Sequence, residues 1–211
     1  MGIRDLHCHL LPGIDDGYGA EEDFVRMLRI YRESGVSAIA FTPHLYNPYV
    51  TTHVERLRTT YRWAEALALA EGITPYLGGE VFLADGGQQE LLPIAGRYQL
   101  VEFSLSLPPA NLIPWVRKVV AEGIVPIIAH VERYLWLGVH SPLLRQLIDF
   151  GCLLQCNVEA VESGEAEAFL TAGLVDVIAT DNHGDESLAP RLAQAIAAWP
   201  DVAEKMQRLI L

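Results

Sequence analysis

The sequence predicts an α/β protein whose parallel strands form a distorted, TIM-like (β/α)7 barrel. Two observations support this class. Short apolar runs without clean alternation, typical of parallel strands buried on both faces, alternate with helical patterns. Helical patterns also end at a glycine that an apolar run follows at once, at Gly35, Gly72, Gly123, Gly151 and Gly173. Because such a pattern does not by itself close a sheet, a doubly wound open sheet is the alternative.

Seven apolar runs are the strand candidates. They cover residues 3–7, 37–42, 74–78, 99–103, 124–129, 152–157 and 175–180. No glycine-rich dinucleotide or Walker motif follows the first of them, so a nucleotide-binding fold is not indicated. In a parallel barrel the carboxyl ends of all strands meet at one mouth.

Apolar spacing and end signals predict the helices between these strands. Phe24, Leu28 and Tyr31 are spaced by four and three residues, and residues 54–64 continue that period on a second helix. Thr52 and Glu55 have the spacing of a capping box, and Ser141 precedes a first-turn proline. Further helices are expected over residues 114–122 and 187–199.

Composition limits the class of protein. A chain of 211 residues, 51% hydrophobic and 20% charged, suits a single domain over residues 1–211. A net charge of −12 disfavours a nucleic-acid partner, and the absence of a long apolar run disfavours membrane insertion. The odd number of cysteines and the lack of a signal-like start favour a cytoplasmic protein with reduced thiols, Cys152 and Cys156 being buried.

The predicted carboxyl ends of six strands carry a metal-ligand type of residue. These residues are His7 and His9, His44, Glu80, Glu102, His130, and Asp181 with His183. Side chains at alternate strand positions point the same way, so His7 and His9 can share one ion. Imidazole with carboxylate favours Zn, Mn or Fe, and so many donors favour two or three ions. Asp15 or Asp16, in a tight loop after His9, can add a further carboxylate, and the spacing does not choose between them.

These motifs, taken in order, resemble the PHP (polymerase and histidinol phosphatase) family. The run from His7 to Gly17, HCHLLPGIDDG, carries the resemblance together with Thr42-Pro43-His44, Gly79-Glu80-Val81, residues 100–103, 130–133 and 181–183. The nearest resemblance is to the bacterial protein-tyrosine phosphatases of that family associated with capsule and exopolysaccharide synthesis. It covers nearly the whole chain.

The resemblance implies a three-metal centre, usually described with Mn, Fe or Zn. The ligands it implies are His7, His9, Asp16, His44, Glu80, Glu102, His130, Asp181 and His183. Arg133 matches the arginine that binds the substrate phosphate. A second such arginine is expected soon after His183, and Arg191 is the candidate although its offset is larger than expected.

The function implied is hydrolysis of a phosphomonoester by in-line attack of a metal-bound water. The substrate would be phosphotyrosine on the tail of a bacterial tyrosine kinase, with Asp181 or His183 assisting proton transfer to the leaving oxygen. A small-molecule phosphatase such as histidinol phosphatase is the alternative, and a non-catalytic metal-binding regulator is a further one. A cysteine phosphatase is excluded because Ile14 stands where the His-Cys-x5-Arg loop needs arginine, and an amidohydrolase is disfavoured because strand four offers Glu102 rather than lysine.

Overall fold

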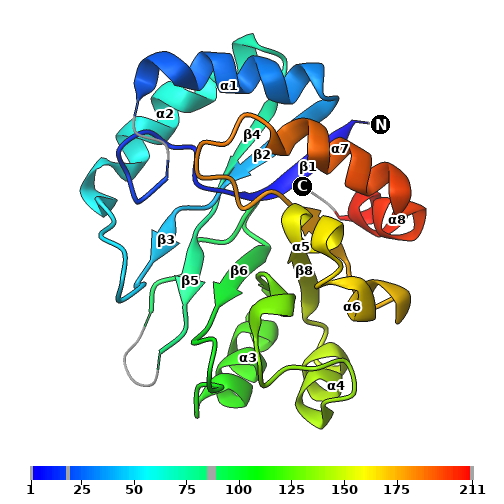
Figure 1. The fold of residues 1–211 in the computed structure, drawn as a ribbon. Helices are drawn as coiled ribbons and strands as arrows, with labels where there is room; N and C mark the ends of the chain where they lie inside the picture. Colours follow the sequence, from blue (N-terminus) through cyan, green and yellow to red (C-terminus); the bar gives the residue numbers. More distant parts are fainter. Residues whose placement is uncertain (1, 18–19, 85–88, 210–211) are drawn as a thin grey trace.

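The strands of the computed structural model, which describes residues 2–17, 20–84 and 89–209, all run parallel to their neighbours. Hydrogen bonds order them as β1-β2-β4 and as β3-β5-β6-β7-β8-β9 (Figure 1). The strands are β1 (Ile3–Cys8), β2 (Val36–Phe41), β3 (His44–Leu45), β4 (Thr74–Leu77), β5 (Glu80–Phe82), β6 (Tyr98–Glu102), β7 (Val125–Ile128), β8 (Leu153–Asn157) and β9 (Val177–Ala179).

Two of the seven predicted strands continue past a break into a second short strand. β2 and β3 are separated by Thr42 and Pro43, and β4 and β5 by Gly78 and Gly79. Proline has no N–H to donate to a ladder. A Cβ on Gly78 would lie 2.5 Å from Ile94 Cγ1, so only glycine allows this approach. Beyond the breaks the pairing resumes.

The last strand meets the first at their carboxyl ends. His9 N donates to Asn182 O at 2.8 Å, Asp181 N donates to His7 O at 2.8 Å, and Cys8 and Asn182 form a parallel bridge. Counting β2/β3 and β4/β5 as single strands, the pairings therefore connect seven strands in the order of a distorted barrel. The predicted α/β class with seven parallel strands is confirmed.

Helices surround the strands (Figure 1). In the described residues they are α1 (Glu21–Glu33), α2 (Val54–Ala70), α3 (Leu112–Ala121), α4 (Pro142–Asp149), α5 (Val158–Ser163), α6 (Glu167–Thr171), α7 (Leu188–Ala198) and α8 (Pro200–Arg208), with a 3₁₀ turn η1 (Val131–Arg133). The predicted core face of α1 is correct, because Phe24, Leu28 and Tyr31 are fully buried. All five glycines predicted to end helices have a positive φ.

Helix ends show one correct and one wrong prediction. Ser141 Oγ accepts from Leu144 N at 3.4 Å and caps α4. The capping box at Thr52 and Glu55 is wrong: His53 is the N-cap of α2 without a side-chain cap, and the Thr52 hydroxyl donates to His44 O at 2.6 Å. Helices α5 and α8 were not predicted, and α6 was indicated only by the glycine at its end, Gly173. No described helix is long and apolar enough to span a bilayer.

Candidate metal centre

Two histidines from β1 face each other at the mouth of the barrel. His7 lies at the carboxyl end of β1, and His9 comes two residues later, just past the strand. Because alternate residues of a strand face the same way, both side chains point to the same side. Their Nε2 atoms are 3.2 Å apart. Both side chains are fully buried, so no bulk water can separate them.

The outer nitrogens of the two rings fix their tautomers. His7 Nδ1 lies 3.1 Å from Gln155 Oε1, and this oxygen also accepts from His130 N at 2.7 Å. His9 Nδ1 lies 2.7 Å from Asp15 Oδ2. Because both partners are acceptors, both Nδ1 atoms donate and both Nε2 atoms direct lone pairs at one another. Such a pair needs a cation, or a proton, between them.

Two carboxylates complete the surroundings of this pair. Asp181 Oδ1 lies 3.2 Å from His7 Nε2 and 3.4 Å from His9 Nε2. Glu80 Oε1 lies 3.3 Å from His7 Nε2 and 3.0 Å from His130 Nε2. Burial lowers the pKa of His9, but its hydrogen bonds with carboxylates outweigh burial and raise that pKa well above the ordinary value. The cluster thus attracts positive charge strongly.

Glu80 is the carboxylate at the centre of the cluster. It is fully buried, and the register places it directly opposite His44. Burial raises the pKa of its carboxyl, but the neighbouring imidazoles, His7 foremost, hold it well below the usual range. Its Oε2 lies 2.9 Å from His44 Nδ1 but has no hydrogen-bond partner of good geometry. A buried carboxylate oxygen without a hydrogen-bond partner is expected at a site that binds a cation.

A second set of donors lies at the open side of the mouth. His44 Nδ1 lies 3.0 Å from Glu102 Oε1, and His44 Nε2 lies 3.6 Å from Asp16 Oδ1. His183 Nε2 is 3.5 Å from the same Asp16 oxygen, and its Nδ1 donates to Asp181 O at 2.8 Å. Asp16 is half-exposed. Asp16 and His183 face solvent, whereas His44 and Glu102 are buried and the His7–His9 pair is fully buried.

Ligand atoms of the described residues form three groups within which all atoms lie inside 4.8 Å. The groups are His7, His9 and Asp181; His44, Glu80 and Glu102; and His9, Asp16, His44 and His183. His130 lies outside all three groups but contacts Glu80, and its Nδ1 is buried without a partner. The structure therefore brings together all nine residues predicted as ligands.

These residues suit transition-metal ions. Imidazole and carboxylate donors together are typical of Zn, Mn and Fe sites. The facing lone pairs of His7 and His9 and the unpartnered Glu80 oxygen are independent structural reasons to expect cations. Between Asp15 and Asp16, the structure assigns different places: Asp15 braces His9 from outside, and Asp16 faces His44 and His183.

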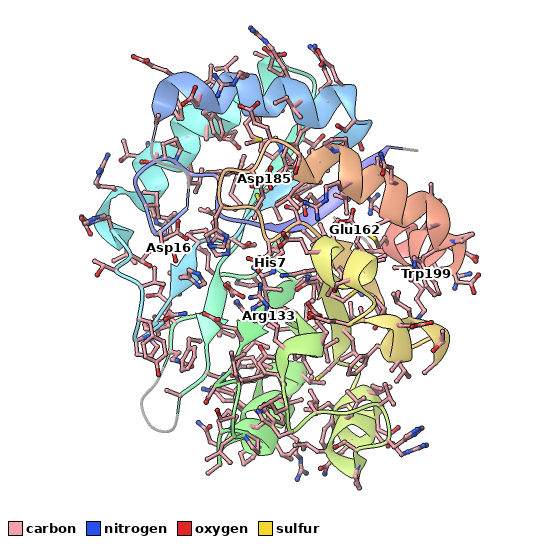
Figure 2. All side chains as sticks on the ribbon, viewed as in Figure 1. His7, Asp16, Arg133, Glu162, Asp185 and Trp199 are labelled. Atoms are coloured by element: carbon pink, nitrogen blue, oxygen red, sulfur yellow. The ribbon has the colours of Figure 1, made fainter. Side chains whose placement is uncertain are left out.

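The donors open into a cavity of about 480 Å³. Its lining includes Asp16, His44, Glu102, His130, Arg133, Asp181 and His183, together with Glu159, Asp185 and Leu188. The Arg133 guanidinium is half-exposed, and its Nη2 lies 3.3 Å from Asp181 Oδ2. In Figure 2, His7 and Arg133 lie near the centre of the view and Asp16 beside the mouth. Among the described residues that line the cavity, Arg133 is the one arginine or lysine.

Arg191 lies beside this cavity but outside its described lining. Its Nη2 is 2.5 Å from Glu162 Oε2 on α5, and it is absent from the described lining of the cavity. Asp185, which does line the cavity, is 4.0 Å from Arg191 Nη1. The predicted contact of Arg191 with substrate therefore requires that it leave Glu162. Cys8 is not in the described lining of the cavity either: it is fully buried, and burial raises the pKa of its thiol well above the ordinary value.

The sequence pattern did not identify the residues that hydrogen-bond to the candidate ligands and hold them in place. Gln155 Nε2 donates to Asn157 Oδ1 at 2.7 Å, and Asn157 Nδ2 donates to Asp181 Oδ2 at 2.9 Å. The two amides alternate on β8, the one predicted strand whose end lacked a strong ligand. Polar residues at alternate positions of an otherwise buried strand are the signal that could have identified them.

Barrel and mouth together define a class: a distorted parallel α/β barrel of the PHP type, with a candidate centre for several metal ions at its strand ends. More specifically, the chain belongs to the CpsB/CapC family, described as capsular polysaccharide synthesis, CpsB/CapC, whose model matches residues 3–208.

Similar proteins agree with this placement. The tyrosine-protein phosphatase CpsB of Streptococcus pneumoniae is 29% identical, over 90% of this chain and 87% of its own. The tyrosine-protein phosphatase YwqE of Bacillus subtilis (strain 168) is 26% identical, over 85% of this chain and 76% of its own. A solved chain from the crystal structures of YwqE and CpsB, described as unique metal-dependent tyrosine phosphatases, superposes with a TM-score of 0.74 at 23% identity, over 97% of this chain and 87% of that one.

Proposed function

We propose that this protein is a metal-dependent phosphomonoesterase that hydrolyses phosphotyrosine in proteins. One observation carries the proposal: the inward-facing lone pairs of His7 and His9, ringed by buried carboxylates, lie at the mouth that the half-exposed Arg133 also lines. Cations and an arginine at one cavity suit an anionic phosphoester. The names of the family members CpsB and YwqE, both tyrosine-protein phosphatases, support the same substrate class.

Two or three ions, of Mn, Fe or Zn, match the three groups of donors. His7, His9 and Asp181 would hold the deep ion, and His44, Glu80 and Glu102 a second, with His130 beside Glu80. Asp16 and His183 would add an outer position with His9 and His44. When bound, such ions would supply an activated water and neutralise charge on phosphate oxygens.

Arg133 would bind a non-bridging phosphate oxygen. Its guanidinium can make two parallel hydrogen bonds, and Asp181 at 3.3 Å holds it at the edge of the donor cluster. Charge on the phosphoryl oxygens would be stabilised by this contact as the bond to water forms and the ester P–O bond breaks. Arg191 would serve as a second phosphate ligand only after release from Glu162.

The leaving oxygen takes a proton in the products. Asp181 and His183 line the cavity, and either could transfer that proton. Tyrosine phenolate is a good leaving group, so this assistance should matter less for phosphotyrosine than for an alkyl phosphate. The phosphorylated tail of a bacterial tyrosine kinase, in control of capsule or exopolysaccharide synthesis, is the substrate that we propose.

Hydrolysis of p-nitrophenyl phosphate with added Mn²⁺, and with EDTA, tests the proposed function. We expect turnover that EDTA abolishes, and a kcat/KM for a phosphotyrosine peptide above that for histidinol phosphate. Arg133→Ala should lower kcat/KM by about 100-fold, the usual loss for a group that stabilises transition-state charge. Arg145→Ala, at an exposed arginine on α4, is the control. Stoichiometric metal without any turnover would favour the regulator, and a preference for histidinol phosphate the small-molecule phosphatase.

A further inference from the structure

The rim of the mouth is divided by charge. Residues 103–116 and 134–144, which follow β6 and β7, contain no Asp, Glu, Lys or Arg. On the other side, residues 158–167 include four glutamates, and Asp16, Glu159 and Asp185 all line the cavity. In Figure 2, Asp185 and Glu162 lie on the side of α5 and α7. A chain of net charge −12 thus has a long uncharged stretch beside its mouth.

The two uncharged loops are joined to each other. Phe103 N donates to Tyr134 Oη at 3.2 Å, and Leu135 N donates to Leu105 O at 3.2 Å. Trp136 Nε1 donates to Ser104 O at 3.0 Å. The ring of Tyr134 stands 5.3 Å from that of Phe103 and 5.3 Å from that of Trp136. These contacts hold the loops in one arrangement, so the surface they present is preorganised.

Three leucines project from these loops into solvent. Leu105 is 51% exposed, Leu107 71% and Leu135 87%. We call these three residues the leucine ledge. A single exposed leucine is ordinary, but several together on loops fixed by hydrogen bonds and aromatic packing are typical of a binding surface.

The leucine ledge adjoins the candidate metal centre. Leu135 stands two residues after Arg133, and Leu105 three residues after Glu102, and both of those residues line the cavity. The Tyr134 ring, which supports the ledge, lies 5.7 Å from the ring of His130. A chain whose phosphate is bound in the cavity would therefore pass over the ledge as it leaves on this side.

We propose that the leucine ledge binds apolar side chains next to the phosphotyrosine of a protein substrate. This inference rests on the proposed function. The occupant is an extended segment with an apolar residue beside the phosphotyrosine, because the ledge itself is uncharged and the facing rim is acidic. Acidic neighbours would be repelled by Asp16, Glu159 and Asp185. None of the three ledge residues is in the described lining of the cavity, so a small phosphoester bound there is not expected to contact them.

Substitution of two residues of the leucine ledge by serine tests the proposal. Leu105→Ser with Leu135→Ser should lower kcat/KM for a phosphotyrosine peptide with leucine neighbours by about tenfold, through a higher KM, because contacts common to ground and transition states are lost. On p-nitrophenyl phosphate the double variant should match the wild type. Leu69→Ser is the matched control: Leu69 is 58% exposed near the end of α2, which returns to the amino-terminal edge of the barrel.

The wild type should also prefer leucine-flanked over aspartate-flanked phosphotyrosine peptides, and the double variant should lose most of this preference. Equal losses on p-nitrophenyl phosphate, or the same loss in Leu69→Ser, would overturn the proposal. A change of oligomeric state in the double variant, measured by light scattering, would assign the ledge to a second copy instead. A wild type active on p-nitrophenyl phosphate without peptide preference refutes the ledge alone, whereas inactivity with every metal refutes the proposed function and the ledge with it.

Discussion

Asp5 accepts hydrogen bonds from both the backbone amide and the hydroxyl of Thr180, joining β1 to the residue that precedes Asp181. Asp5 is fully buried, and burial raises the pKa of its carboxyl. Tyr31 of α1 donates to the same carboxylate at 3.1 Å, and Asn182 donates to Tyr31 at 3.0 Å. Because Asp181 has a φ of +52°, which side chains rarely adopt, this network fixes the backbone that carries a candidate ligand.

Asp5→Ala should weaken metal binding although Asp5 belongs to none of the three groups of candidate ligands. Removal of an outer partner typically costs about 10–100-fold in metal affinity. Buried donors left unpaired should also cost about 1–3 kcal/mol of stability. Metal titration and thermal unfolding of the metal-free protein measure the two effects. Asp5→Asn, which keeps one acceptor for Thr180 N, should lie between wild type and Asp5→Ala.

Asp176→Ala is the control for stability alone. Asp176 Oδ2 accepts from Leu154 N at 3.0 Å, and Asp176 pairs with Lys205, at the amino end of β9 away from the mouth. It should lower the unfolding temperature and leave metal affinity unchanged. An equal loss of affinity in both variants would show that Asp5 acts only through general stability.

Asp15 is expected to orient His9 rather than to bind metal. Asp15→Ala removes the acceptor that holds His9 Nδ1 as a donor, so metal affinity should fall by about 10–100-fold. Asp15→Asn can still accept from His9 Nδ1 through its amide oxygen and should retain most of the affinity. Isothermal titration with Zn²⁺ or Mn²⁺ compares them. Equal, large losses in the two variants would instead indicate that the Asp15 carboxylate itself binds metal.

The metal-free protein should become less stable as pH rises. Burial lowers the pKa of His44, but the nearby carboxylates of Glu102 and Glu80 outweigh burial and raise that pKa from 6.5 to about 10. Since the folded pKa is the higher one, the contribution is complete below pH 6.5 and is lost between pH 6.5 and about 10. Each kcal/mol lost lowers the unfolding temperature of a chain this size by about 2–4 °C.

Unfolding temperatures recorded in EDTA across that pH window should fall more steeply for the wild type than for His44→Gln. Parallel pH profiles would mean that His44 does not carry a raised pKa. With metal present the trend reverses for affinity, because imidazole must lose its proton to bind an ion.

Cys8→Ser should leave activity largely intact. The Cys8 thiol donates to Ala40 O at 3.4 Å and is fully buried, so it cannot reach a phosphoester. A serine hydroxyl can make the same hydrogen bond, and the stability cost should be about 1 kcal/mol. Turnover of p-nitrophenyl phosphate at saturating Mn²⁺ measures the outcome. Inactivity of a variant that still binds metal would point to a thiol nucleophile.

The positions of candidate ligands were predictable because strand ends of a parallel barrel meet wherever the strands lie in the sequence. Once the apolar runs are assigned to a parallel barrel, His7 and Asp181 are expected at the same mouth. Their braces could not, since the contact of Gln155 with His7 depends on how strands distant in sequence pack across the barrel. The break at Thr42 and Pro43 was not predicted either, because the pairing with neighbouring strands decides where a strand stops.

Competition between local and distant partners bears on two other predictions: the capping box, which is wrong, and the role of Arg191, which stays a prediction. Thr52 has the spacing of a capping residue, yet its hydroxyl donates to His44 O and so supports β3 instead of α2. Arg191 follows the last histidine in the chain as a phosphate-binding arginine would, yet α5 presents Glu162 to its guanidinium. In both cases the side chain makes a hydrogen bond with a residue distant in sequence, and not the contact that the sequence motif predicts.

Metal content tests the central claim most directly. Wild-type protein supplied with Mn²⁺, Fe²⁺ or Zn²⁺, then desalted and analysed by mass spectrometry, should retain two or three transition-metal ions per chain. His9→Ala, which removes one of the two histidines that each belong to two of the three groups, should retain fewer. Wild-type protein that retains no stoichiometric metal, or a His9→Ala variant with unchanged content, would contradict it.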